Sequence, residues 1–225
     1  LSFCESWDED LHMNALENKG EGEATSSVDE SLSSGFSFSS RIQYPIRYKA
    51  TKIFLPPNAV LERNRVLSAL TPPPVLQSYK LLRTQVLHKL QATGWNSIGV
   101  LCARAGGGSS LTAINLAISL AMDPRATVLL VDLNLRSPSI HRFFDFEPEF
   151  GVLDVIAQKA ALADVLFNPG IDSLSVLPGK TPIENSSELL AAPEASRFFQ
   201  DIKSRYRSRV IIFDLPPALE ADDAI

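Results

Sequence analysis

The sequence predicts an α/β fold in which a parallel sheet is flanked by helices on both faces, and three observations support this. Short apolar runs alternate along the chain with stretches of helical periodicity. These runs are continuously apolar, which is typical of strands buried on both faces of a parallel sheet. The 225 residues, 45% of them hydrophobic, suffice for one such domain with an additional segment.

Each element follows from its own residues. Apolar positions recur every three or four residues from 75 to 90, which predicts a long helix that ends at Gly94. Buried strands are predicted at 98–102, 127–132, 174–177 and 209–214, and the second and fourth of them end in an aspartate. Residues 110–122 are apolar nearly all round and of helical length, which predicts a helix. Further helices are predicted at 138–144, 151–157, 161–166, 184–190 and 194–206.

The first 73 residues differ from the rest in composition. Residues 1–40 hold nine acids, one lysine and ten serines, which predicts a disordered acidic, serine-rich tail. Residues 41–73 are predicted to be a basic, proline-rich linker, with a strand at 51–55. Tyrosines among the basic residues leave an anion-binding surface open as an alternative, but no nucleic-acid partner is expected. The folded domain is predicted at 74–225.

The composition also bears on where the protein acts. No run approaches about 18 consecutive apolar residues, so no membrane-spanning helix is expected. The acidic start is unlike a signal peptide, and two cysteines form no disulfide framework. We therefore expect a cytoplasmic protein. The chain begins without Met and stops at Ile225 in a predicted loop, as a fragment would.

The segment RAGGGSS, from Arg104 to Ser110, follows a predicted strand and precedes a helix. Glycines in this position turn backbone N–H groups inward, and the helix N-terminus favours phosphate. The dinucleotide fingerprint fails because Leu111 stands in the place of its third glycine. The P-loop pattern fits at Gly108 and Ser110, but Ser109 occupies its lysine position. Taken alone, the loop suits a phosphate site or a simple tight turn.

Two acids add to this pattern. Asp132 and Asp214 end separate buried strands, where an unpaired carboxylate is costly. A magnesium ion near the glycine loop, with the Ser110 hydroxyl as a further ligand, explains both acids. The alternative is that each aspartate caps a helix or turn.

Five segments, taken together, resemble the bacterial tyrosine kinases. They are YKLLRT at 79–84, GGGSSLTAINLA at 106–117, VLLVDLNLR at 128–136, NSSELL at 185–190 and FDLPP at 213–217. These kinases are cytoplasmic autokinases of capsule and exopolysaccharide synthesis, related to the MinD and ParA ATPases. The resemblance covers residues 75–224 and implies a P-loop NTPase-like fold with ATP or ADP and Mg²⁺ as cofactors.

The resemblance also implies roles for single residues. Gly106, Gly107, Gly108, Ser109, Ser110 and Leu111 would bind the phosphates as the Walker A loop. Asp132 would match the Walker A′ acid, which binds magnesium and serves as base for the tyrosine hydroxyl, and Asn134 replaces a second acid of that motif. Asp214 would match the Walker B acid. The metal ligands implied are Ser110, Asp132 and Asp214.

Partners are implied in the same way. The family associates with a membrane-anchored polysaccharide co-polymerase, which would place this chain at the inner membrane through its partner. Gln77, Lys80 and Arg83 occupy the family's Glu-x-x-Arg-x-x-Arg motif, which docks subunits in a ring, and only Arg83 is unchanged. The family sheet has further strands beyond residue 225, so the edge at 98–102 is expected to be bare or covered by residues 51–55.

The departure at Ser109 leaves three hypotheses. In the first, the chain is a tyrosine autokinase that transfers phosphate from Mg-ATP. In the second, it is a catalytically impaired adaptor for the co-polymerase that binds nucleotide weakly or not at all, because it lacks the lysine that would neutralise charge during transfer. In the third, it is a partitioning-type ATPase that uses Arg104 across a dimer. Arg104 lies where MinD and ParA proteins carry a signature lysine, and it either contacts phosphates or faces solvent.

Overall fold

The computed structural model describes residues 51–204 and 209–220. The predicted acidic tail at 1–40 and the first ten residues of the predicted linker lie outside these ranges. Within the described part, residues 51–72 do more than connect: they form a strand and a helix, and Val60, Val66 and Leu67 are buried.

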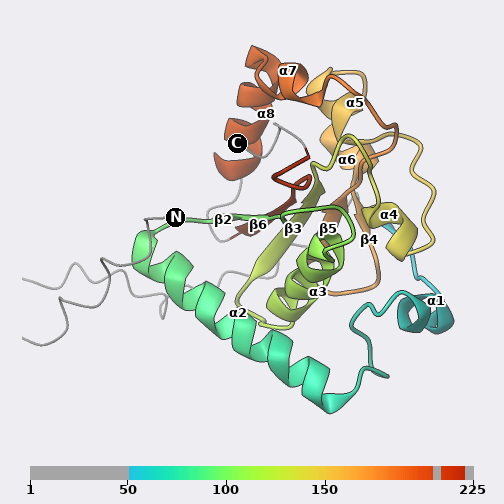
Figure 1. The fold of residues 1–225 in the computed structure, drawn as a ribbon, viewed down its shortest axis with the longest axis vertical. Coiled ribbons are helices and arrows are strands. Elements are labelled where there is room, and N and C mark those ends of the chain that lie inside the picture. Colours follow the sequence, from blue (N-terminus) through green and yellow to red (C-terminus); the bar gives the residue numbers. More distant parts are fainter. Residues whose placement is uncertain (1–50, 205–208, 221–225) are drawn as a thin grey trace, which may run out of the picture. The chain divides into compact units, whose positions relative to one another are not determined.

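Six strands form one mainly parallel sheet (Figure 1). Their order across the sheet is β1-β4-β5-β3-β6-β2, and every neighbouring pair is parallel except β4 and β5. The predicted fold class is therefore confirmed, with one antiparallel pair that the sequence pattern did not show. The strands are β1 Lys52–Ile53, β2 Ser97–Val100, β3 Thr127–Asp132, β4 Phe167–Asn168, β5 Leu174–Leu177 and β6 Arg209–Asp214.

Helices cover both faces of this sheet (Figure 1). All the predicted helices are present within a few residues of their expected bounds, and α1 is an addition. The long helix α2 ends where Gly94 adopts a left-handed φ of 69°. The helices are α1 Asn58–Arg63, α2 Pro73–Thr93, α3 Ser109–Ala121, α4 Ile140–Phe143, α5 Val152–Ile156, α6 Leu162–Val165, α7 Ser186–Leu190 and α8 Pro193–Ser204.

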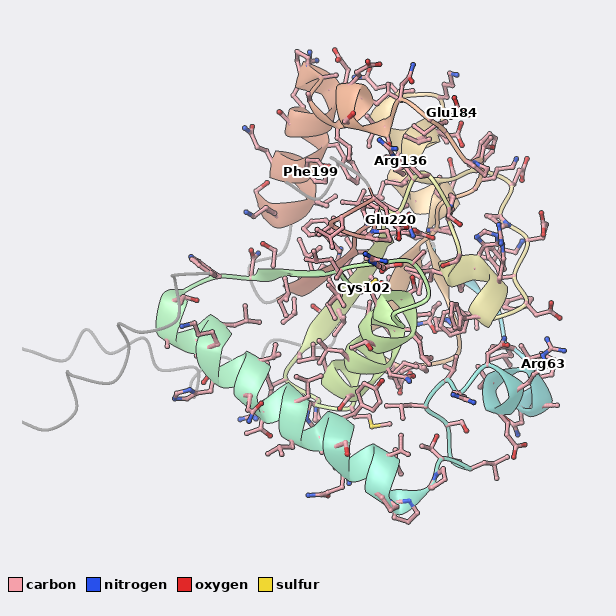
Figure 2. All side chains as sticks on the ribbon, in the orientation of Figure 1. Arg63, Cys102, Arg136, Glu184, Phe199 and Glu220 are labelled. Carbon is pink, nitrogen blue, oxygen red and sulfur yellow. The ribbon has the colours of Figure 1, made fainter. Side chains whose placement is uncertain are left out.

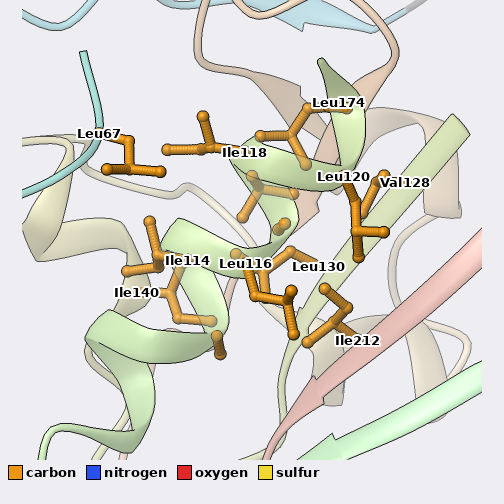
Figure 3. Packing of buried hydrophobic residues seen from close by; sticks show 14 of the residues in the cluster. Leu67, Ile114, Leu116, Ile118, Leu120, Val128, Leu130, Ile140, Leu174 and Ile212 are labelled. Atoms are coloured by element: carbon orange, nitrogen blue, oxygen red, sulfur yellow. The ribbon is translucent and has the colours of Figure 1, made fainter. Parts of the chain in front are cut away.

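The larger core lies between the sheet and helix α3. Side chains alternate across a strand, so Val128 and Leu130 of β3 pack on this face with Ile212 of β6 (Figure 3). Helix α3 is buried from Ala113 to Ala121, which explains why its sequence is apolar nearly all round. Helix α2 lies outside α3 and adds one buried leucine and a row of half-buried apolar residues.

The opposite face of the sheet carries a second core. Leu129 and Val131 of β3 and Ile211 of β6 point to this side, the reverse of their neighbours in the chain. Helices α5, α6, α7 and α8 cover it, and Phe198 and Ile202 are the buried residues of α8 that pack there. The sheet is thus enclosed between two apolar layers, and its strand ends are left for polar side chains.

One buried amide ties the segment after α1 to the core. Asn115, in the middle of α3, accepts a hydrogen bond from the Leu67 N–H at 2.8 Å and donates to the Arg65 carbonyl at 3.0 Å. Both polar ends of this side chain are therefore satisfied, as a buried amide requires. These bonds hold residues 65–67 against helix α3.

Of the two alternatives for the sheet edge at β2, cover by residues 51–55 is excluded. Residues 51–55 form β1 beside β4, at the edge farthest from β2. The β1 strand pairs with β4 in parallel, and the Phe54 N–H also donates to the Asn168 carbonyl at 2.9 Å. No pattern in the sequence indicates the two-residue strand β4, with which β1 pairs. Strand β2 pairs only with β6 among the described strands.

Candidate functional site

Three strand ends bring the predicted site residues together. In the sheet register Asp214 of β6 stands opposite Asp132 of β3 on one side and Val100 of β2 on the other. Asp132 and Asp214 continue the row of β3 and β6 residues that faces α3, so both carboxylates lie on the side where the glycine loop begins that helix. Functional groups in parallel sheets gather at this edge, outside the carboxyl ends of the strands.

The glycine loop has the backbone of an anion cradle. Gly106 and Gly108 have φ values of 79° and 82°, in the left-handed region that favours glycine. A Cβ on Gly107 would lie 2.8 Å from Cys102 Cβ and 3.2 Å from the Arg104 carbonyl oxygen, so no larger residue fits without movement. Helix α3 starts directly after Gly108, which has no side chain to cap it, and the first N–H groups of a helix lack partners within the helix.

Asp214 is a buried carboxylate without hydrogen-bond partners. Its exposed fraction is 0%, and neither carboxylate oxygen accepts a hydrogen bond from any residue in the described part of the chain. Burial raises the pKa of this carboxyl to about 7; the nearby Ser110 side chain lowers it, and the neighbouring Asp132 raises it further. A group of this kind is costly unless something pairs with it. Its environment therefore favours a cation beside Ser110.

Asp132 is equally buried, but it has partners. Its Oδ2 accepts the N–H groups of Ser139 at 2.9 Å and Ile140 at 3.1 Å, and its Oδ1 accepts that of Asn134 at 3.2 Å. Burial raises the pKa of this carboxyl to about 6, while these backbone donors partly oppose the rise. The contacts of Asp132 therefore agree with the alternative that this aspartate caps a turn and a helix: its carboxylate holds the loop 133–139 and the first residue of α4 by hydrogen bonds.

We expect the replacement of Asp132 by alanine to lower the free energy of unfolding by about 2–4 kcal/mol, because several buried N–H groups would lose their acceptor. Asparagine keeps one acceptor oxygen, so Asp132→Asn should cost less than half as much. Chemical denaturation of both variants measures this difference, with Ser139→Ala as a control that leaves the backbone donors paired. If Asp132→Ala is as stable as the parent, Asp132 does not hold the loop.

Ser109 stands in the lysine position of the P-loop pattern, and neither its side chain nor that of Arg104 places a positive charge in the adjacent cavity. The Ser109 Oγ lies 3.4 Å from Cys102 Sγ, and this thiol donates to the Arg104 carbonyl at 2.9 Å. Ser109 is the first residue of α3 and is half-buried. The Arg104 side chain is exposed, and this residue is not among those that line the adjacent cavity. The structure therefore brings Ser109, and not Arg104, to the predicted phosphate position.

A cavity of about 510 Å³ opens over the glycine loop. Figure 2 shows three of its labelled residues, Cys102, Arg136 and Glu220, in the region where β2, β3 and β6 end. The predicted residues Gly106, Gly108, Ser109, Ser110 and Leu111 line it together with Asn134, Ser137, Ser139, Phe143, Pro216, Pro217 and Ala105. Asp132 and Asp214 are fully buried at the strand ends and are not among the lining residues.

Sequence reasoning missed two charged residues of this cavity. Arg136 follows β3 by four positions, inside a segment that carried the family resemblance, but no role was expected for it. Glu220 reaches the loop from the segment after β6, and its Oε1 accepts the Ala105 N–H at 3.2 Å. The spacing of Glu220 from the loop, 115 residues along the chain, gives no local signal, whereas Arg136 stands next to predicted site residues.

The predicted docking motif on α2 is divided by the fold. The Arg83 Nη1 donates to the Ser119 carbonyl at 2.9 Å, and the Ser119 Oγ donates to the Tyr79 carbonyl at 3.2 Å. These bonds join α2 to α3 within one chain. Gln77 and Lys80 are exposed. Arg83 therefore contributes to internal packing, and the role of the three residues in a subunit ring stays a prediction.

Known proteins resemble this chain in both sequence and fold. No family model matches it. The tyrosine-protein kinase YwqD of Bacillus subtilis is 30% identical to it over 166 residues, which cover 73% of this chain and 68% of YwqD. The chain belongs to the bacterial tyrosine kinase family.

Other bacterial tyrosine kinases agree with this assignment. A putative tyrosine-protein kinase EpsB of Ralstonia solanacearum is 30% identical over 156 residues, which are 68% of this chain but only 20% of EpsB. The kinase domain of the Escherichia coli tyrosine kinase ETK has a similar fold, with a TM-score of 0.60 and 26% identity over 66% of this chain and 57% of that domain. The chain thus spans about a fifth of some family members and about two thirds of others.

The described residues also bear on membrane contact within this family. None of the helices in ranges 51–204 and 209–220 combines the length and apolarity needed to cross a bilayer.

In the same ranges no three His, Cys, Asp or Glu side chains lie close enough together to hold a metal ion by themselves. A cation at Asp214 would need ligands beyond protein carboxylates, such as a hydroxyl, water or a phosphate.

Proposed function

We propose that this member of the bacterial tyrosine kinase family binds Mg-ATP over the glycine loop and transfers its γ-phosphoryl group to tyrosine at a reduced rate. The observation that carries the proposal is the buried, unpartnered carboxylate of Asp214 beside Ser110, below that loop. A catalytic or structural cation explains why the fold retains such a group, and Mg-nucleotide is the ligand that a phosphate cradle next to a carboxylate suits best.

The chain's own groups divide the work of binding. The backbone N–H groups of residues 106–110 and the N-terminus of the 13-residue helix α3 would hold the phosphate oxygens. The Ser110 hydroxyl and the Asp214 carboxylate fit Mg²⁺, which prefers a few oxygen ligands and keeps several waters. When bound, magnesium would neutralise charge on the β- and γ-phosphates. Asp132 adds negative charge beside Asp214 and keeps the loop 133–139 in place.

The tyrosine hydroxyl needs a group that can accept its proton. Asp132 is the candidate that the resemblance implies, and its pKa of about 6 leaves it ionised at neutral pH. Its three backbone donors use most of the acceptor capacity of a carboxylate. We therefore infer a weak base at this position, which together with the serine at 109 favours slow transfer.

A second function, that of a nucleotide-binding adaptor with negligible transfer, is favoured by one specific observation. Ser109 directs its hydroxyl to Cys102 Sγ, so the position that would contact the β- and γ-phosphates presents no cation. In either case we propose that the protein serves capsule or exopolysaccharide synthesis beside a membrane-anchored co-polymerase, from the cytoplasmic side. That proposal rests on the family and not on a contact in the structure.

Nucleotide binding and its metal dependence test the proposal directly. Isothermal titration with ATP in excess Mg²⁺ should give saturable binding that weakens at least about tenfold when EDTA replaces the metal, because the cation offsets the charge of Asp214 and of the phosphates. Transfer from radiolabelled ATP should appear on tyrosine, in the protein itself or in an added tyrosine-containing polymer. Equal ATP binding with and without magnesium would count against a cation at Asp214.

A further inference from the structure

The segment that follows β6 runs beside the start of the glycine loop. The Ala218 N–H donates to the Cys102 carbonyl at 2.9 Å, and the Leu219 N–H donates to the Ala103 carbonyl at 3.1 Å. These two bonds join the chain after β6 to the chain after β2, beyond the point where the two strands end. The backbone that leads to Glu220 is therefore held next to the loop that is proposed to bind phosphate.

Glu220 lies at the end of this segment, with its side chain on the glycine loop. Its own N–H donates to the Pro217 carbonyl at 3.1 Å. Its Oε1 accepts the Ala105 N–H at 3.2 Å. Glu220 is also the single carboxylate among the described residues that line the cavity of about 510 Å³, and Figure 2 shows it in the region of Cys102. A negative charge thus stands beside the proposed phosphate cradle.

We propose that Glu220 is a specificity determinant that disfavours a polyphosphate without its metal ion, an inference that rests on the nucleotide site proposed above. Carboxylate and phosphate oxygens are both negatively charged, so they repel one another across the cavity. Both also accept hydrogen bonds, so a phosphate that reached the Ala105 N–H would have to displace Glu220. A bound Mg²⁺ offsets much of the phosphate charge and reduces this repulsion. The cavity therefore accepts Mg-nucleotide more readily than the free anion.

The two buried aspartates have a different part in this selection. Asp214 is buried beside Ser110, where its charge would attract the metal ion. Asp132 is also buried, and its carboxylate accepts three backbone N–H groups. Neither aspartate lines the cavity, whereas Glu220 is exposed on its wall. Glu220 is therefore the acid that an incoming anion meets.

Nucleotide with and without its metal tests the role of Glu220. Affinities for ATP are measured by titration calorimetry, in excess Mg²⁺ and in EDTA, for the parent, Glu220→Gln, Glu220→Ala and Glu184→Gln. We expect both Glu220 variants to bind metal-free ATP about 3- to 10-fold more tightly, as the loss of a solvent-screened repulsion allows, and Mg-ATP less than about twofold more tightly. The preference for the metal complex should therefore shrink. Glu184 is exposed and does not line the cavity, so Glu184→Gln should match the parent.

Ionic strength separates a charge effect from a structural one. Salt screens the repulsion, so the gain of Glu220→Gln for metal-free ATP should fall by at least about half between ~0.05 M and ~0.5 M salt. The inference is overturned if the Glu220 variants bind metal-free ATP no more tightly than the parent, if Mg-ATP gains as much, or if salt leaves the gain unchanged.

The parent protein tells this failure apart from failure of the proposed function. If the parent binds Mg-ATP and the Glu220 replacements change nothing, this inference alone fails. If neither the parent nor the variants bind ATP in excess Mg²⁺, the proposed function is refuted together with it. Thermal unfolding without nucleotide shows that each variant is folded, and two different replacements at an exposed position guard against a defect of one of them.

Discussion

Replacement of Asp214 by asparagine is expected to stabilise the nucleotide-free protein and to remove its response to Mg-ATP. The carboxylate is fully buried and has no hydrogen-bond partner among the described residues, so its ionised form opposes folding. We expect Asp214→Asn to raise the free energy of unfolding by about 1–3 kcal/mol at pH 8, since an amide is cheaper to bury than an unpaired charge. If Asp214 stabilised the fold, the same replacement would lower the free energy of unfolding.

The pH dependence of stability follows from the same carboxyl. Its pKa in the folded protein is about 7, against 3.8 for the unperturbed group. Between these values the folded state holds a proton that the unfolded state has released, so the free energy of unfolding falls as the pH rises from about 4 to about 7. The shift corresponds to about 4 kcal/mol at most. Asp132, with a pKa of about 6, contributes in the same direction over a narrower range.

Urea denaturation of the parent and Asp214→Asn between pH 4 and 8 measures both effects. The variant should lose the upper part of the pH slope, while Asp172→Asn, which alters an exposed carboxylate, should retain it. Addition of Mg-ATP should raise the melting temperature of the parent and leave that of Asp214→Asn unchanged, and phosphoryl transfer should fall about 10²- to 10³-fold. A variant that is less stable than the parent yet still responds to Mg-ATP would contradict a cation site at Asp214.

The central strands could be predicted to the residue because burial on both faces marks them in the sequence. Strands β3, β5 and β6 begin and end where the apolar runs do. Strand β4 and helix α1 could not be predicted in this way, since each is short and its place depends on distant partners such as Val176, opposite Phe167. The same reason explains why the place of residues 51–55 in the sheet could not be predicted: β1 pairs with β4, and a two-residue strand leaves no periodicity to detect.

The candidate site was predictable in its parts but not in its contacts. The glycine loop and the two aspartates stand at strand ends, so their convergence follows from parallel topology. The difference in hydrogen bonding between the two carboxylates does not follow from topology. Asp132 accepts hydrogen bonds from backbone N–H groups seven and eight residues away, whereas Asp214 has no such donors. Arg136 shows the same limit: its neighbours Leu135 and Pro138 are buried, and only the folded loop reveals that the arginine between them lines the cavity.

Replacement of Ser109 by lysine is expected to raise both nucleotide affinity and the rate of phosphoryl transfer. The serine side chain contacts Cys102 Sγ at 3.4 Å, a weak interaction whose loss costs little. A lysine at the start of α3 has the cavity of about 510 Å³ in front of it. One charge-assisted bond should tighten ATP binding about 10- to 100-fold. A cation placed at the transferring phosphate should accelerate transfer about 10²- to 10³-fold.

The measurement is the rate of tyrosine phosphorylation from radiolabelled ATP, compared among the parent, Ser109→Lys and Ser109→Met. Methionine has a similar length without charge, so a gain confined to lysine identifies charge as the cause. If Ser109→Lys binds ATP tightly but transfers nothing, the defect lies elsewhere, with the heavily hydrogen-bonded Asp132 as the next candidate, and the adaptor hypothesis is favoured. If the parent already equals Ser109→Lys in both rate and affinity, the serine at position 109 does not limit nucleotide binding or transfer.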